Sequence, residues 1–199
     1  MTPGSVDGEL LVLGLGNPLL GDDGVGLALL EELAAAPDPG VEYLDGGTQG
    51  LALLGRIARR RALLIVDAVK TGAAPGTVHA LRGAAAMEWL RGGATTAHES
   101  NAGELLAAAA LLGMAPAEIA IVGVEPERLE IGMGLTDAVR RALPQAVARA
   151  RDAIAEMAGE AEAPAAEAPA ARAPEARAPE AVLRPAGPGA MLVDERGMI

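Results

Sequence analysis

Short apolar runs alternate with helical stretches along residues 9–158. Four short runs rich in apolar residues have the length of strands buried on both faces: Glu9–Leu15, Val41–Asp45, Ala62–Val69 and Glu118–Val124. Four segments between and after them have the composition and spacing of helices: Val25–Ala36, Leu51–Arg60, Ala102–Leu112 and Thr136–Met157. This alternation predicts a mostly parallel sheet with helices on both faces.

A fifth strand is predicted at Thr77–Leu81, where apolar and polar residues alternate after the Pro75-Gly76 turn. Alternation of this kind is typical of an antiparallel strand near the edge of a sheet. The predicted fold class is therefore α/β, a three-layer sandwich with a mostly parallel sheet of about five strands, one of them antiparallel. Such sheets bind ligands beyond the carboxyl ends of their strands, near the point where the strand order reverses.

The composition changes after Gly159. Residues 160–190 repeat Ala, Pro, Glu and Arg irregularly. Proline interrupts helices, and these side chains bury too little apolar area to offset the entropy of ordering. We expect one α/β domain over residues 1–158 and a disordered tail over residues 159–199.

The charge of the chain disfavours several classes of partner. It has 27 acidic and 16 basic residues, a formal net charge of −11, whereas nucleic acids and anionic membranes bind clustered positive charge. The longest run of apolar and small residues, Leu105–Ala117, is shorter than the about 20 residues of a membrane span. We expect a cytoplasmic monomer that binds neither nucleic acid nor membrane.

Rare residues narrow the possible chemistry. The chain has no cysteine, two histidines, His79 and His98, and two serines, Ser5 and Ser100. Thiolate nucleophiles and sulfur-ligated metals are excluded, and neither serine lies in a context that suits a Ser/His/Asp triad. Carboxylates and one histidine remain, so any metal must be bound by oxygen and nitrogen.

Two adjacent acids, Asp22 and Asp23, follow the first predicted strand in GLGNPLLGDDGVG. Carboxylates cap helix N-termini, but one helix start needs one cap and adjacent carboxylates repel, so capping explains Asp22 better than Asp23. A dinucleotide-binding loop is the competing interpretation. Leu19 stands where G-x-G-x-x-G requires its third glycine, which argues against it.

Three further residues are candidates for the same edge of the sheet. Asp67 follows five apolar residues and must be paired, with Lys70 for example, or act as a ligand. His98 lies in a polar loop, where histidines often bind metals or transfer protons, whereas His79 alternates on a strand and is predicted to be structural. Asp45 is either a turn former or a further site residue. Together Asp23, Asp45, Asp67 and His98 suit a divalent metal such as Ni, Zn or Mn.

Seven segments of the chain together form a recognisable pattern: VLGLGNPLLGDDGVG, LDGGTQGLALLG, LLIVDAV, APGTVHAL, TTAHES, IVGVEPE and GLTDAV. In these segments the chain resembles the [NiFe]-hydrogenase maturation endopeptidases. The similarity is collinear over residues 9–155. It implies an endopeptidase, without a Ser or Cys nucleophile, that removes the C-terminal extension of a [NiFe]-hydrogenase large-subunit precursor after nickel insertion. The nickel belongs to the substrate, and no organic cofactor is implied.

By the same resemblance, the nickel-contacting and catalytic positions are Asp23, Asp67 and His98, with Asp45 as a possible addition. Glu99-Ser100-Asn101 departs from the residues that follow this histidine in many relatives, which leaves the hydrogenase subgroup open. Water could be activated by a carboxylate or through polarisation of the peptide carbonyl by nickel. The alternative is a non-enzymatic nickel-binding chaperone that uses the same ligands.

Overall fold

The computed structural model describes residues 9–91, 95–96 and 101–162. These residues lie within one compact unit of the chain, and residues 165–199 lie outside the described residues. The last described helix runs to Glu162, so helical structure continues five residues beyond the predicted end at Met157. Most of the predicted tail, 163–199, lies outside the described residues.

One mixed sheet organises the unit, with the strand order β2-β1-β3-β6-β4. Strands β1, β2, β3 and β6 are parallel, and β4 pairs with β6 in the antiparallel direction, as the sequence predicted. A short strand, β5, pairs with the end of β3. The strands are β1 (Leu10–Leu15), β2 (Val41–Gly47), β3 (Ala62–Lys70), β4 (Val78–Arg82), β5 (Thr95–Thr96) and β6 (Glu118–Val124).

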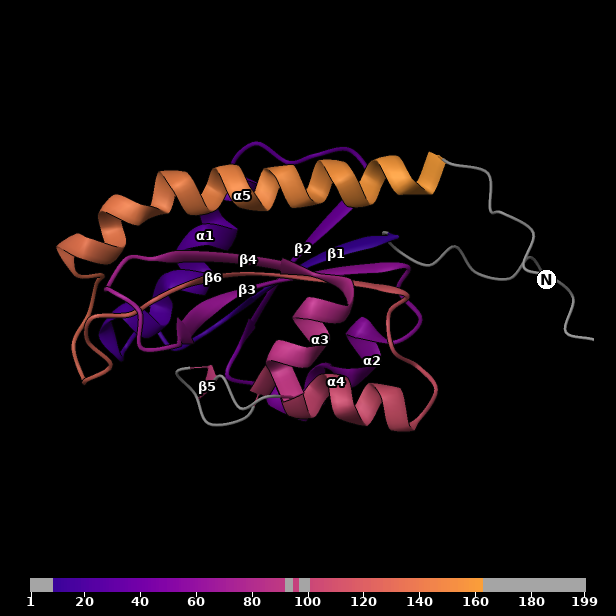
Figure 1. Cartoon of the computed structure of the whole chain (residues 1–199), viewed down its shortest axis with the longest axis horizontal. Helices are drawn as coiled ribbons and strands as arrows, with labels where there is room; N and C mark the ends of the chain where they lie inside the picture. The colour runs from indigo at the N-terminus through magenta and orange to yellow at the C-terminus, as the bar shows by residue number, and fades with distance from the viewer. Residues whose placement is uncertain (1–8, 92–94, 97–100, 163–199) are drawn as a thin grey trace, which may run out of the picture. The chain divides into compact units, whose positions relative to one another are not determined.

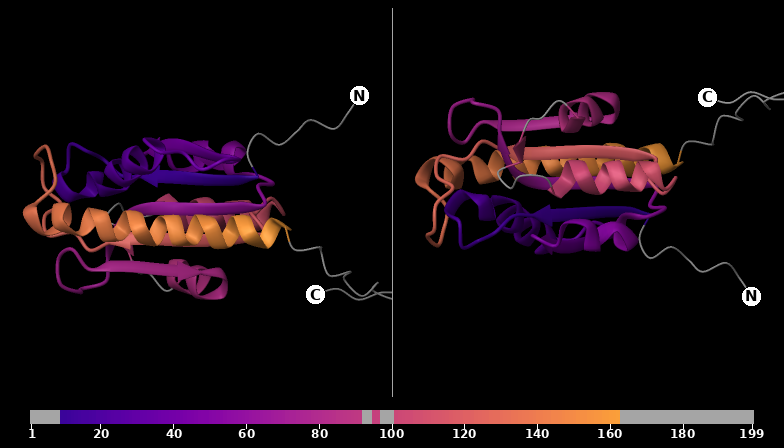
Figure 2. Two further views of the ribbon diagram at one scale, coloured as in Figure 1. Left: turned by 90° about the horizontal axis from the view of Figure 1, so that it is seen from above. Right: turned by 90° about the horizontal axis from the view of Figure 1, so that it is seen from below.

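Helices cover both faces of the sheet and confirm the predicted three-layer α/β fold (Figure 1). One apolar core lies between the sheet and α1 with α5, and a second lies between the opposite face and α2, α3 and α4. Figure 2 shows α5 across one face and α4 across the other. The helical segments are η1 (Gly21–Gly24), α1 (Val25–Ala34), η2 (Gly50–Leu53), α2 (Leu54–Ile57), α3 (Gly83–Arg91), α4 (Asn101–Leu111) and α5 (Asp137–Glu162).

Three elements differ from the sequence prediction. The helix predicted over Leu51–Arg60 is shorter, because Arg59 adopts the left-handed conformation with φ of 61° and donates its N–H to the carbonyl of Met114. Helix α3 was not predicted, although its run of Ala, Met, Glu and Leu favours a helix. The two-residue β5 depends on pairing with Val69 and Lys70, which a local pattern cannot show.

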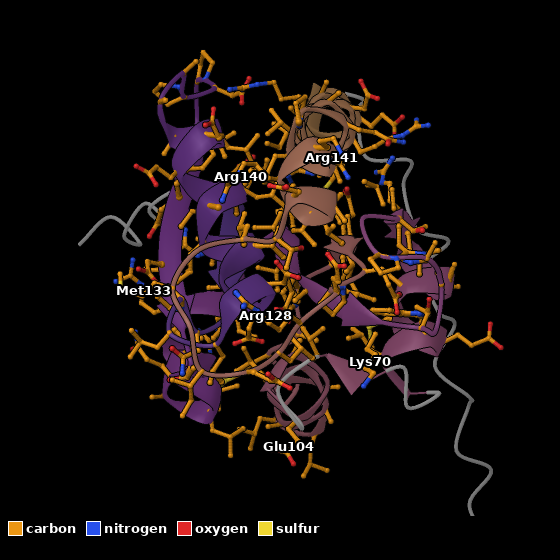
Figure 3. All side chains as sticks on the ribbon, turned by 90° about the vertical axis from the view of Figure 1, so that its left-hand side faces the viewer. Lys70, Glu104, Arg128, Met133, Arg140 and Arg141 are labelled. Carbon is orange, nitrogen blue, oxygen red and sulfur yellow. The ribbon has the colours of Figure 1, made fainter. Side chains whose placement is uncertain are left out.

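The order of the strands defines where a ligand can bind. The chain leaves β1 through α1 to reach β2 on one side, and it then returns to the other side of β1 as β3. In sheets of this kind, ligands bind at such a reversal, here at the carboxyl ends of β1 and β3. Figure 3 looks onto this end of the sheet. None of the helices in the described part of the chain has the length and apolar character that a membrane span requires.

Candidate functional site

The start of α1 packs directly onto the carboxyl ends of β1 and β3. A Cβ at Gly26 would lie 2.2 Å from the carbonyl oxygen of Leu15 and 2.5 Å from that of Val66, and 3.0 Å from the Cα of Asp67. Only glycine permits this approach. The turn that carries Asp23 is therefore held against the strand that carries Asp67.

Asp67 lies inside β3, three residues before the strand ends, and its side chain is buried. Its Oδ1 accepts a hydrogen bond of 2.7 Å from the N–H of Ala68. Burial raises the pKa of Asp67, this hydrogen bond lowers it, and the negative charge of Asp23 raises it, with a net value of about 8. The carboxyl group of Asp23 is thus close enough to influence the ionisation of Asp67.

Asp23 lies in η1 and is also buried. Its Oδ2 accepts a hydrogen bond of 2.7 Å from the N–H of Asn17, the first residue of the turn after β1. The side chain of Asn17 in turn accepts a hydrogen bond from the N–H of Leu19. The loop after β1 therefore orients the carboxylate of Asp23.

Asp22 has a different role from its neighbour. No side-chain cap is formed at the start of η1 or α1, so the capping role expected for this acid is wrong. Its Oδ2 accepts hydrogen bonds from the N–H groups of Glu127 and Arg128 and the hydroxyl of Thr136, and its Oδ1 accepts one from the N–H of Thr136. The fully buried carboxylate ties the loop between β6 and α5 to η1.

The structure places Asp45 and Asp67 on opposite faces of the sheet. Along β2 the side chains alternate: a Cβ at Gly46 would meet Leu13, Leu15 and Leu53 in the core beneath α2 and α4. Asp45, the neighbour of Gly46, therefore faces the α1 side of the sheet. Asp67 lies two and four positions after Ile65 and Leu63, which pack beneath α2 and α4, so it faces that side.

The exposed Asp45 lines a groove of about 600 Å³ along α1. Residues of α1, of β2 and of the loops around Pro18 and Gly134 complete the lining of this groove. Asp45 does not join Asp23 and Asp67 in a cluster of three acids in the part of the chain that the structure describes, and a role for Asp45 in the reaction stays a prediction.

The proposed ion pair between Lys70 and Asp67 is also absent. Lys70 is exposed at the end of β3 and forms no ion pair with any residue that the structure describes. Residues an odd number of positions apart on a strand point to opposite faces. Asp67 and Lys70 are three apart, so they cannot pair within a regular strand.

His79 has the structural surroundings that the sequence predicted. Its Nε2 lies 3.5 Å from Glu125 Oε2 and 3.4 Å from Thr71 Oγ1. Sequence reasoning did not single out Glu125, which is buried and accepts hydrogen bonds from the N–H groups of Thr71 and Gly72 and the hydroxyl of Thr71. Burial raises the pKa of Glu125, but these hydrogen bonds outweigh it and the net pKa is lowered.

Glu125 therefore fixes the loop between β3 and β4, and its carboxylate is fully used by that loop. An acid directly after a buried strand, followed by proline, was the available signal.

His98 lies outside the described residues, in the segment 97–100. Within the ranges 9–91, 95–96 and 101–162, no three His, Asp or Glu side chains gather closely enough to hold a metal. The described part of the candidate site therefore consists of the two carboxyl groups of Asp23 and Asp67.

This pair suits both proton transfer and cation binding. A carboxyl group with a pKa of about 8 holds its proton near neutral pH and can donate it. A divalent cation beside the pair would favour the charged form of both groups, because opposite charge lowers the pKa of an acid. Binding of a cation would therefore release a proton.

Comparisons with known proteins agree with one another. A family model described as hydrogenase maturation protease matches residues 27–153. The chain is 38% identical to the hydrogenase 2 maturation protease of Escherichia coli, over 77% of this chain and 94% of that protein. It is 37% identical to the hydrogenase expression/formation protein HoxM of Azotobacter vinelandii, over 74% and 73% of the two chains.

Solved structures give the same result. The hydrogenase maturating endopeptidase HybD from Escherichia coli superposes with a TM-score of 0.68 at 36% identity, covering 74% of this chain and 92% of that one. The [NiFe] hydrogenase maturation protease HybD from Thermococcus kodakarensis superposes with a TM-score of 0.61 at 31% identity, covering 72% and 97%.

Proposed function

Because the chain belongs to the hydrogenase maturation protease family and is an endopeptidase, we propose that it removes the C-terminal extension of a [NiFe]-hydrogenase large-subunit precursor. We further propose that cleavage follows nickel insertion and that the bound nickel marks the precursor as ready. The metal is then part of the substrate.

One observation carries this proposal: two carboxyl groups from distant parts of the chain lie near each other at the carboxyl ends of β1 and β3, where the strand order reverses. Asp23 comes from the turn after β1 and Asp67 from β3, and the charge of Asp23 raises the pKa of Asp67. Buried carboxyl groups beside each other are costly for folding. A cation that arrives with the substrate would relieve this cost.

In the proposed reaction Asp23, Asp67 and His98 contact the nickel of the precursor and thereby position the nearby scissile peptide bond. Holding the reacting groups in place lowers the entropic part of the barrier. The cation favours ionised Asp67, and an ionised carboxylate can accept a proton from the attacking water. Membership of a protease family favours this enzyme over the non-enzymatic nickel-binding chaperone.

The test is cleavage of the large-subunit precursor encoded in the same genome, with and without nickel, followed by the change in its mobility on a gel. We expect the wild-type protein to shorten the nickel-loaded precursor only. Asp23→Asn, Asp67→Asn and His98→Gln should each slow cleavage by about a hundredfold or more. Asp152→Asn, which alters an exposed acid on α5, is the matched control.

Two results would contradict the proposal. Rapid processing by all three site variants would remove these residues from the reaction. Equal processing of nickel-free and nickel-loaded precursor would remove the metal from recognition.

A further inference from the structure

Three exposed apolar side chains gather near the candidate site. Among the described residues, six large apolar side chains are more than half exposed. Three of these six, Leu19, Ile131 and Met133, come from two loops at the carboxyl end of the sheet, with exposures of 59%, 91% and 84%. We call these three residues the apolar rim. Figure 3 shows Met133 at the outer side of the loop that crosses this end of the molecule.

Backbone pairing brings the apolar rim together. Leu20 and Gly132 form a parallel bridge, in which Gly132 donates its N–H to the carbonyl of Leu19 and accepts the N–H of Gly21. Residues on either side of a bridged residue point to the face opposite to it. Leu19, Ile131 and Met133 are the chain neighbours of the bridged residues, so the bridge brings these three exposed residues together, while Leu20 is half-buried.

The apolar rim is held in place rather than carried on a loose loop. The carboxylate of Asp22 accepts four hydrogen bonds from Glu127, Arg128 and Thr136, which bracket Ile131 and Met133. The N–H of Asp22 also donates to the carbonyl of Arg128. A surface that is fixed before binding loses less conformational entropy when a partner covers it.

Two hydrogen bonds connect the apolar rim to Asp23. Leu19 donates its N–H to the side chain of Asn17, and Asn17 donates its own N–H to the carboxylate of Asp23. The groove of about 600 Å³ along α1 begins at the same two loops, at Pro18, Gly21 and Gly134. The apolar rim therefore lies beside both the loop that orients Asp23 and one end of the groove.

We propose that the apolar rim is the docking surface for an apolar segment of the large-subunit precursor, and this inference rests on the proposed function. An endopeptidase must hold a polypeptide beside its site, and contiguous exposed apolar side chains on a protein surface mark a binding site. Two hydrogen bonds through Asn17 place the apolar rim next to Asp23, and the polypeptide that an endopeptidase cleaves must come to this part of the molecule. The substrate is therefore the occupant.

The experiment compares two double variants, each of which removes two neighbouring apolar side chains that are more than half exposed. Ile131→Ser with Met133→Ser alters the apolar rim. Leu111→Ser with Leu112→Ser alters the end of α4, before the start of β6 and away from the carboxyl ends of the parallel strands. Leu111 and Leu112 are 88% and 55% exposed. The probe is the nickel-loaded precursor, with KM and kcat measured from cleavage and Kd from anisotropy of the labelled precursor.

We expect the rim variant to raise KM and Kd by about tenfold or more while kcat stays within about twofold, since interface side chains in contact with a partner contribute at this level. The α4 variant should match the wild-type protein. Unchanged KM and Kd, equal effects of both double variants, or a loss confined to kcat would overturn the inference. Elution of the wild-type protein as a dimer that the rim variant abolishes would assign the surface to a second copy and overturn it as well.

If the proposed function fails, the same measurements give a different result. A wild-type protein that binds the precursor without cleaving it contradicts the proposed function, and Kd of the two double variants still decides the docking surface. A wild-type protein that neither binds nor cleaves the precursor overturns both.

Discussion

Asp22 and Asp23 are neighbours in the chain, yet their carboxylates do different work. Four hydrogen bonds from the loop between β6 and α5 use both oxygens of Asp22. Asp23 instead influences the ionisation of Asp67. At the scale of single residues, Asp22 therefore fixes a neighbouring loop, whereas Asp23 belongs to the candidate site.

Asp67→Asn should change how stability depends on pH. The folded protein keeps the Asp67 proton up to about pH 8, whereas the unfolded chain releases it near the ordinary aspartate pKa of 3.8. The folded state therefore binds more protons between these values, and the free energy of unfolding falls as pH rises through them. Relative to Asp67→Asn, the wild-type protein should lose at most about 1.4 kcal/mol per pH unit between pH 5 and 7.

Urea unfolding of both proteins at pH 5, 6 and 7 measures this difference. Asp45→Asn removes an exposed carboxylate from the other face of the sheet and serves as the control. The stability of this variant should depend on pH as that of the wild-type protein does. Parallel curves for the wild-type protein and Asp67→Asn would show that Asp67 is ionised in the folded state.

At the scale of elements, the distance between Asp23 and Asp67 depends on how closely α1 approaches the sheet. Gly26→Ala would place a methyl group 2.2 Å from the carbonyl oxygen of Leu15, where no side chain can move aside. The helix must shift, and we expect the free energy of unfolding to fall by about 3 kcal/mol or more. The rate of cleavage should fall by more than the fraction of folded protein does, because Asp23 moves with α1.

Gly55→Ala is the matched control for this change. Gly55 lies in α2, and a Cβ there would meet no atom within 4 Å. Alanine favours a helix over glycine by about 1 kcal/mol, so this variant should be as stable as the wild-type protein or more stable. Thermal unfolding and precursor cleavage of both variants test the prediction, and an unaffected Gly26→Ala would show that α1 does not set the site.

At the scale of the whole molecule, the two cores on either face of the sheet are formed by residues between Leu10 and Met157. Removal of residues 163–199 leaves both cores complete, so the midpoint of thermal unfolding should change by no more than about 2 °C. This truncation tests the predicted boundary between domain and tail.

A truncation after Asp152 should behave differently. It removes the buried side chains of Ile154 and Met157 and the carbonyl of Met157, which accepts a hydrogen bond from Arg61. We expect a loss of about 4 kcal/mol or more in the free energy of unfolding. A large effect of the first truncation in differential scanning calorimetry would place part of residues 163–199 in the fold.

The alternation of apolar and polar positions was sufficient to predict the layers, the parallel strands and the antiparallel β4, because strand and helix periods are properties of neighbouring residues. It was also sufficient to bring Asp23 and Asp67 to one edge of the sheet, since both follow or end apolar runs that become adjacent parallel strands. His98 stays a prediction, because it lies outside the described residues.

The tertiary structure decided which acid meets which partner. Asp22 binds residues more than 100 positions away, Asp45 faces the opposite side of the sheet from Asp67, and Lys70 points away from Asp67. Leu19 and Ile131 become neighbours only through the bridge between Leu20 and Gly132. Local patterns report periodicity, whereas these contacts depend on strand order, on the face each side chain takes and on loops fixed by distant residues.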